Sequence, residues 1–217
     1  MLTQKRREKE KEQRRNLILD AAQTLFFSKN YDEISIEEIA EKAQLAKGTL
    51  YTYFKSKEAL YSGVALRGAH IMNEMFKEAV SRYQSGLEKA SAIGEAYYEF
   101  YKRHSHYFQM LVQAETLAVA RSDDVNAAGL IEVSCENLEI VLDAVVLGIK
   151  DGSIKPYIDP KQTSIFLIQS TRAMILLPPG FEMFLKEAGA DKDAAIKFTL
   201  QALRLSLENT QSKKLEA

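Results

Sequence analysis

The stretch from Ser35 to Leu60 constrains the fold more than any other part of the sequence. The Ser35 hydroxyl can cap a helix, and Glu38, three residues later, can reach back to the Ser35 N–H, which is the pattern of a capping box. This start is followed by about two turns of apolar residues at helical spacing, namely Ile36, Ile39, Ala40 and Ala43. The pattern predicts a short helix with one buried face.

A second short helix follows after a tight turn at Gln44 and Leu45. It opens at about Ala46, and Leu50 and Phe54 lie one turn apart on the face that would pack inward. Two short helices joined in this way predict a helix-turn-helix.

The outward face of the second helix is suited to a DNA groove. Gly48 lets the backbone approach a ligand closely, and the free N–H groups at the helix N-terminus favour phosphate. Lys47 can donate to guanine, threonines can contact a phosphate or a thymine methyl group, and tyrosine hydroxyls can bind phosphates. The alternative is a set of solvated positions on a small helical bundle.

The run A-K-G-T-L-Y-T-Y-F-K-S-K-E-A-L, residues 46–60, resembles the recognition-helix signature of the TetR family of bacterial and archaeal transcriptional regulators. The resemblance extends back to about Leu17 and covers roughly the first quarter of the chain. The family usually has glycine where Gln44 stands, because this position commonly needs a left-handed backbone. Glutamine in that conformation would cost about 1 kcal/mol. The resemblance implies a phosphate contact for Lys57, and with it we expect the DNA-binding residues to be Ser35, Lys47, Gly48, Thr49, Tyr51, Thr52, Tyr53 and Lys57.

A charged arm, residues 1–15, precedes this region. From Lys5 to Arg15 it holds seven basic and three acidic residues without apolar periodicity. It is either a solvated, frayed extension of the next helix or an arm that contacts the DNA backbone or minor groove. An amphipathic helix follows from Leu17 and should cover the back of the helix-turn-helix. We therefore place the DNA-binding domain at 16–57 and an effector-binding and dimerisation domain at 58–217.

Composition and charge agree with this division. The formal net charge is −1, but residues 1–57 hold 12 basic against 9 acidic side chains, as expected for a DNA-binding head on an acidic body. The single cysteine, Cys135, excludes an intramolecular disulfide, and we expect it to be a small buried residue. No signal peptide is recognisable and the most apolar segments are too short for a bilayer, so we expect a cytoplasmic protein with no membrane partner.

The remainder of the chain predicts helix after helix and no strand. The fold class is all-α: a three-helix head followed by a helical body, with about nine or ten helices in all. The last two long helices, near 160–177 and 191–209, are apolar on two sides, so one face needs either the rest of the body or a partner chain. The TetR resemblance implies a homodimer interface here, for which we select Ile165, Ile168, Arg172, Phe198, Ala202 and Leu205.

No catalytic or metal-binding pattern is present. The sequence lacks a Gly-rich phosphate loop, G-x-S-x-G and H-E-x-x-H, and His104 and His106 are two residues apart, so they point in different directions on a helix. We expect no enzyme activity, no cofactor and no metal.

The body is richer in aromatic and flexible apolar side chains than dimerisation requires. The part of the chain that forms the effector cavity in TetR-like proteins contains Met72, Met75, Tyr97, Tyr101, Phe108 and Met110. They are either ordinary core or the lining of a site for a hydrophobic or aromatic effector. The leading prediction is a homodimeric repressor that binds a palindromic operator in double-stranded DNA and is released by that effector. The alternatives are an architectural DNA-binding protein without an effector and a helical enzyme or carrier with an incidental head.

Overall fold

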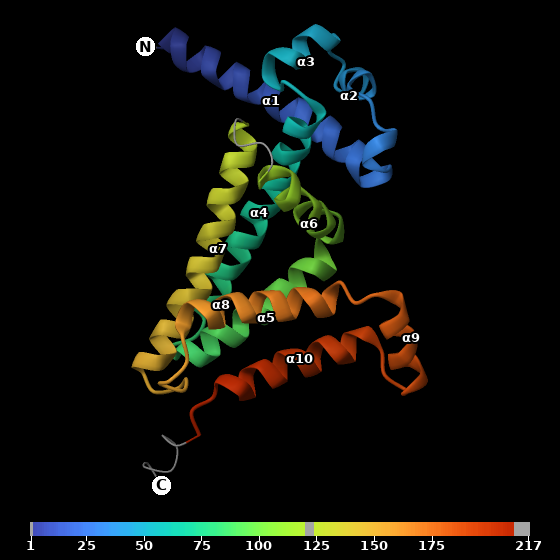
Figure 1. The fold of residues 1–217 in the computed structure, drawn as a ribbon. Coiled ribbons are helices and arrows are strands. Elements are labelled where there is room, and N and C mark those ends of the chain that lie inside the picture. Colours follow the sequence, from blue (N-terminus) through green and yellow to red (C-terminus); the bar gives the residue numbers. More distant parts are fainter. Residues whose placement is uncertain (1, 120–123, 211–217) are drawn as a thin grey trace. The chain divides into compact units, whose positions relative to one another are not determined.

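The computed structural model describes residues 2–119 and 124–210, and these residues form ten α-helices and one 3₁₀ turn (Figure 1). The elements are α1 (Leu2–Ser28), η1 (Tyr31–Glu33), α2 (Ile36–Lys42), α3 (Lys47–Tyr53), α4 (Lys57–Ser81), α5 (Gly86–Arg103), α6 (Ser105–Val119), α7 (Val125–Lys150), α8 (Pro160–Ile175), α9 (Pro179–Glu187) and α10 (Lys192–Leu207). An isolated bridge pairs Ile154 with Glu208. The predicted all-α class and number of helices are confirmed.

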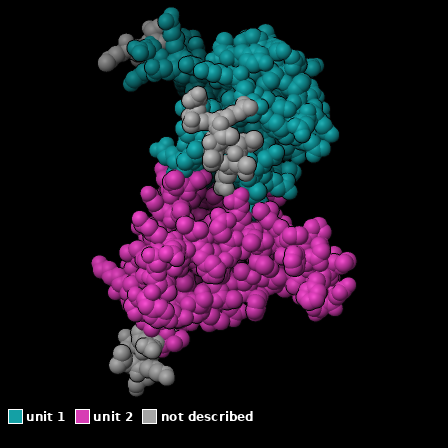
Figure 2. Space-filling view, viewed as in Figure 1, with its two compact units in different colours: residues 1–69, 106–132 teal, residues 70–105, 133–217 magenta. Residues whose placement is uncertain are grey.

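The chain divides into two compact units (Figure 2). The first comprises 1–69 and 106–132, and the second comprises 70–105 and 133–217. Helices α4 and α7 each contribute residues to both units. The unit boundary thus differs from the predicted domain boundary at residue 57, and the functional division of the chain stays a prediction.

The first unit includes α6 because polar contacts join it to the N-terminal helices. The Tyr61 hydroxyl of α4 donates to Gln113 at 2.9 Å, and the Tyr107 hydroxyl of α6 donates to Gln23 at 2.6 Å. Below the helix-turn-helix lies an apolar core of fully or almost fully buried side chains, which includes Ile18, Leu19, Ala22, Ile39, Ala40, Leu50, Phe54, Leu60 and Val64. Helix α1 covers this core, as the sequence predicted.

Helix α1 begins much earlier than its apolar pattern does. It is continuous from Leu2 to Ser28, so the charged arm is a regular helical extension. Residues 4–14 are exposed on every side. The arm is therefore a regular helix, and whether it contacts DNA stays a prediction.

In the second unit, α5, α8 and α10 pack on one another. The two-sided character of α10 is confirmed, because Ile196, Leu203 and Leu207 are buried whereas Phe198 and Leu205 are 71% and 58% exposed. The spacing of Ile165, Ile168 and Ile175 predicts one apolar stripe on α8, and this prediction is wrong in part. The buried face of α8 is formed by Ser164, Leu167, Thr171 and Ile175, so Ile175 does not share a face with Ile165, which is exposed.

Two further expectations are corrected. Cys135 is exposed, not buried, because Val133 and Asn137 occupy the inner side of that part of α7. The run Pro178-Pro179-Gly180 predicts a helix that starts only at Phe181, but α9 begins at Pro179, since proline is well accepted in a first helical turn.

Within residues 2–119 and 124–210 no helix is long and apolar enough to cross a membrane. The same residues contain no group of three His, Cys, Asp or Glu side chains arranged to bind a metal ion. His106 stacks on Phe27, with ring centroids 4.9 Å apart, and His104 lies 5.5 Å from the Phe100 ring.

Candidate nucleic-acid interface

The start of α2 is fixed by the predicted capping box. The Glu38 N–H donates to Ser35 Oγ at 3.1 Å, and the Ser35 N–H donates to the Glu38 carboxylate at 3.0 Å. Glu38 also accepts from Lys29 of α1 at 2.7 Å, and this hydrogen bond is the main reason that the pKa of Glu38 is lowered. Ser35 is thus a structural cap at the edge of the proposed interface.

The turn between α2 and α3 has the backbone that the sequence predicted. Gln44 has a φ of 55°, in the left-handed region, and the Leu45 N–H donates to the Ala40 carbonyl at 2.9 Å. This closes the turn and sets the angle at which α3 leaves α2.

Helix α3 presents its polar side chains outward. Leu50 and the following Phe54 are buried beneath it. On the opposite side Lys47, Gly48, Tyr51 and Thr52 are exposed, while Thr49 and Tyr53 are half-buried. A Cβ atom on Gly48 would meet nothing within 4 Å, so internal packing does not require glycine there. The Thr52 hydroxyl donates to the Thr49 carbonyl at 2.6 Å.

Lys47, the predicted base contact, has a partner that spacing could not reveal. Its ammonium pairs with Glu37 of α2 and lies 5.9 Å from the Tyr51 ring centroid. The hydrogen bond between them lowers the pKa of Glu37 and raises that of Lys47. Both groups are exposed, so water screens the pair and leaves Lys47 able to exchange Glu37 for a DNA acceptor.

Lys57 has intramolecular partners that the resemblance did not imply. Its ammonium donates to the carbonyls of Tyr31 and Ile34 at 2.6 and 2.8 Å and lies 4.0 Å from the Tyr31 ring centroid. It therefore ties the start of α4 to the segment that leads into α2. An ammonium has three donors, so one N–H remains for the phosphate contact, which stays a prediction.

Most of the predicted dimer residues lie on the outer face of the second unit, and one of them lines an internal pocket. Ile165, Phe198, Ala202 and Leu205 are exposed on α8 and α10, and Arg172 is half-buried. Ile168 instead lines a pocket inside the unit, because it follows the buried Leu167 around α8. Exposed apolar side chains that the prediction missed extend the outer face, namely Phe166, Leu176, Phe181, Met183 and Phe184.

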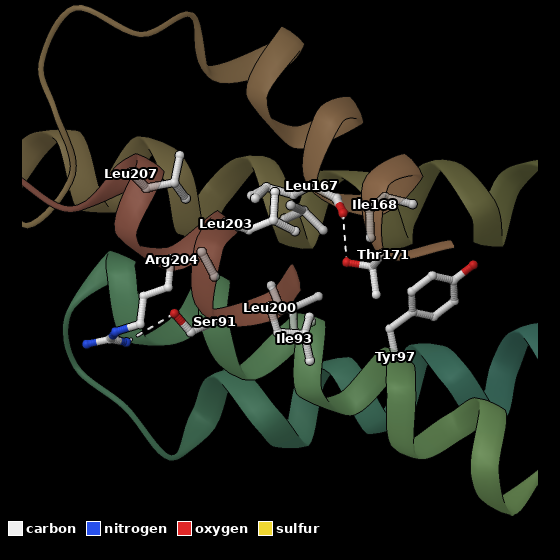
Figure 3. A pocket seen from close by; sticks show the side chains of 13 residues that line it. Ser91, Ile93, Tyr97, Leu167, Ile168, Thr171, Leu200, Leu203, Arg204 and Leu207 are labelled. Carbon is white, nitrogen blue, oxygen red and sulfur yellow. Dashed lines mark hydrogen bonds between the residues drawn. The ribbon is translucent and has the colours of Figure 1, made fainter. Parts of the chain in front are cut away.

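This internal pocket lies among α5, α7, α8 and α10 (Figure 3). Its volume is about 20 Å³, which is room for about one water molecule. Most of its lining is apolar, and Arg204 donates to Ser91 Oγ at 3.1 Å at one end. A larger ligand would have to displace lining side chains such as Leu200 and Leu203.

The predicted ligand residues do not converge on that pocket. Only Tyr97 lines it. Met72 and Tyr101 are half-buried elsewhere in the second unit, and Met75 lines a shallow groove with Ile71. Phe108 and Met110 are buried in the first unit. Helical periodicity identified them as inward-facing, but it could not assign them to a unit.

Comparison with known proteins agrees with this geometry. Residues 18–64 match the family model described as bacterial regulatory proteins, tetR family. The HTH-type transcriptional regulator YhgD of Bacillus subtilis is 28% identical over 168 residues, which cover 75% of this chain and 82% of that protein. The HTH-type transcriptional repressor KstR2 of Rhodococcus jostii is 28% identical over 156 residues, covering 71% and 74% of the two chains.

A solved structure extends the likeness to the fold of the whole chain. The transcriptional regulator FadR from Bacillus subtilis, in complex with stearoyl-CoA, superposes with a TM-score of 0.65 at 18% identity and covers 88% of this chain and 97% of its own. Residues 18–64 thus carry a TetR-family helix-turn-helix, and the chain is similar to transcriptional regulators of that family over most of its length.

Proposed function

We propose that the protein is a homodimeric repressor that binds a palindromic operator and is released by a small, mostly apolar ligand. The observation that carries the DNA-binding part is α3, whose Lys47, Gly48, Tyr51 and Thr52 are exposed above a fully buried Leu50. Such a helix fits a major groove. Lys47 reads a base, Thr49 and Thr52 contact bases or phosphates, and Tyr51, Tyr53 and Lys57 contact phosphates. The protein acts in the cytoplasm, where bacterial DNA lies.

Two copies are needed because one unit leaves a large apolar surface in water. Phe166, Phe184 and Phe198 are all more than half exposed on α8, α9 and α10. Contiguous surfaces of this kind mark interaction sites. A second copy, related by two-fold symmetry, would cover them and place two α3 helices on half-sites one helical turn or more apart.

Selection from random double-stranded DNA tests this proposal. The full-length protein should enrich an inverted repeat and bind it orders of magnitude more tightly than unrelated DNA. Binding without sequence preference would contradict the proposal.

The effector part is supported by relatives, since the FadR structure holds stearoyl-CoA and KstR2 is named a repressor. Reversing a 99:1 preference for the DNA-bound form requires about 5.5 kcal/mol of differential ligand affinity. Titration of the operator complex with stearoyl-CoA should therefore lower operator affinity. If stearoyl-CoA binds and the affinity does not change, the inducible mechanism is wrong.

One observation favours a second candidate, an architectural DNA-binding protein without an effector. The internal pocket of about 20 Å³ is far smaller than the roughly 300–1,000 Å³ of typical ligand sites. The stearoyl-CoA titration separates the two candidates, because only the repressor couples ligand binding to operator release.

A further inference from the structure

The N-terminal half of α1 extends beyond the other helices of the first unit (Figure 1). Residues 4–14 are all exposed, and at 1.5 Å per residue they add about 16 Å of helix. A helix with no apolar face gains nothing from packing in water. Any interaction that this helix makes must therefore come from its charged side chains.

These charges are not evenly distributed around the helix. Arg7, Lys11 and Arg14 follow one another at i, i+4 and i+7, and Ile18 continues the same row four residues later. Ile18 is completely buried. The face of α1 that packs on the helix-turn-helix therefore continues into the extension as a row of three cations.

The acidic residues of the extension lie off this row, and two of the three, Glu10 and Glu12, have cationic partners. Glu10 pairs with Arg6 at 3.0 Å, and Glu12 lies 3.9 Å from Arg15. In the part of the chain that the structure describes, no ion pair involves Arg7, Lys11 or Arg14. The basic row is thus free to bind an external anion.

The base of the extension is held firmly against the head. The Arg15 guanidinium donates to Asn126 of α7 and lies 5.3 Å from the ring of Phe54, which caps the C-terminus of α3. One turn later, Arg67 of α4 donates to Asp20 at 2.7 Å and to Asn16 at 3.1 Å. The extension therefore starts beside the end of the recognition helix and keeps a fixed direction relative to it.

We propose that Arg7, Lys11 and Arg14 bind DNA phosphates flanking each half-site. Helix α1 packs on α2, so the face that carries the row is the face that the helix turns toward the helix-turn-helix. Residues 4–14 are exposed among the residues that the structure describes, and the basic row is therefore accessible to DNA. The contact supplies affinity without base readout. This proposal rests on the proposed DNA-binding function.

The salt dependence of binding tests this proposal. The triple variant Arg7→Gln, Lys11→Gln, Arg14→Gln is compared with a control, Lys5→Gln, Arg6→Gln, Lys9→Gln, which removes the same charge from the opposite face. Glutamine is a good helix former, so the extension stays helical in both. Affinity is measured from low to moderate salt, on the selected operator and on unrelated DNA of equal length.

Each phosphate contact contributes about 0.9 to the slope of log K against log salt. The row variant should therefore lose about 2 to 3 from the magnitude of the slope on both DNAs, with unchanged operator preference, and the control should lose less than about 1. The variant Arg7→Lys, Arg14→Lys keeps the charges and should keep the wild-type slope.

Equal slopes for the two triple variants, or loss of slope in the lysine variant, would overturn the proposal. The test is distinct from that of the repressor function. If the protein selects no operator but the row variant still loses slope on unrelated DNA, the extension binds DNA and the repressor proposal fails. If an operator is selected and the slopes are equal, only the proposal for the extension fails.

Discussion

At the scale of single residues, the turn before the recognition helix contains a residue, Gln44, whose side chain disfavours the backbone conformation that the turn requires. Gln44 has a φ of 55°, and a left-handed conformation costs a residue with a Cβ roughly 1–2 kcal/mol. The side chain is exposed, so removing it opens no cavity.

Gln44→Gly should therefore raise the free energy of unfolding by about 1 kcal/mol. Glu41→Gly, an exposed helical position three residues earlier, should lower it by about 1 kcal/mol. Urea denaturation of both variants checks the pair. A loss of stability in Gln44→Gly would mean that the glutamine side chain stabilises the turn.

Recognition of a base in the operator also depends on a single residue. Lys47→Ala should weaken operator binding by about 1–3 kcal/mol and relax the preference at one base position per half-site. Lys77→Ala is the matched control, because Lys77 is also an exposed lysine paired with a glutamate, Glu74, at 3.3 Å. Repeating the DNA selection with each variant checks the prediction, and an unchanged operator for Lys47→Ala would place base readout on other residues.

At the scale of elements, the junction of α5 and α7 depends on backbone contact. A Cβ on Gly86 would lie 1.9 Å from the Gly148 nitrogen. The loop after α7 also caps α5, since the Gly86 N–H donates to Asp151 at 2.8 Å and the Leu87 N–H donates to Ser153 Oγ at 3.1 Å. Two helices far apart in sequence are thereby fixed to each other.

Gly86→Ala should lower the free energy of unfolding by about 3 kcal/mol or more, because neither backbone can yield cheaply. Gly180→Ala, where a Cβ would meet nothing within 4 Å, should instead raise it by up to about 1 kcal/mol. Chemical denaturation measures the free energy of unfolding of both variants. Equal changes in the two would show that α5 and α7 can separate slightly without a loss of stability.

The same junction should respond to acid. Burial alone would raise the pKa of Asp151, but hydrogen bonds from Ser153 and the Gly86 N–H hold it below its ordinary value of 3.8. Since the folded state favours the carboxylate, this stabilisation is present above the unfolded pKa and is lost as pH falls through the folded one.

Asp151→Asn should accordingly be less stable at neutral pH than the unmodified protein and lose less stability between about pH 4.5 and pH 2.5. Thermal unfolding at several pH values measures both effects. Parallel pH profiles for the two proteins would contradict the assignment.

The sequence predicts those features of the elements that depend on residues close together along the chain. The cap at Ser35 was predicted from its spacing to Glu38, and Asp159 and Asp191 follow the same local rule, because each side chain accepts from the N–H three residues later. The left-handed backbone at Gln44 was predicted from the TetR resemblance, since that family usually has glycine there. The intramolecular partners of Lys57, the Tyr31 and Ile34 carbonyls, were not predicted because they lie more than 20 residues away.

Faces of helices were predicted less well where both sides are apolar. In α8 the spacing placed Ile165 and Ile175 on one face, whereas Ile175 is buried with Leu167 and Ile165 is exposed. Hydrophobicity does not distinguish these side chains. Cys135 was misplaced for the same reason. The ligand residues stay a prediction, and the sequence could not group them in space, since only tertiary packing assigns Phe108 to one unit and Tyr97 to the other.

At the scale of the whole molecule, the apolar outer face of α8 to α10 predicts assembly. Phe198 is 71% exposed in the single chain, so Phe198→Asp should fold and remain monomeric, because an unpaired carboxylate cannot be buried in the interface. Tyr157→Asp, at a 79% exposed position outside these helices, should dimerise normally. Analytical ultracentrifugation at micromolar concentration checks both, and a monomeric unmodified protein would contradict the dimer.

The first unit is built from two separate stretches of chain, and this limits how its DNA specificity can be transferred. Asn126 donates to the Ala59 carbonyl at 3.3 Å, and a Cβ on Gly68 would lie 2.7 Å from the Tyr107 ring. A head excised after its recognition helix would lose these supports. The portable module is therefore residues 1–69 together with 106–132, and a chimaera that exchanges operators between relatives must inherit both segments.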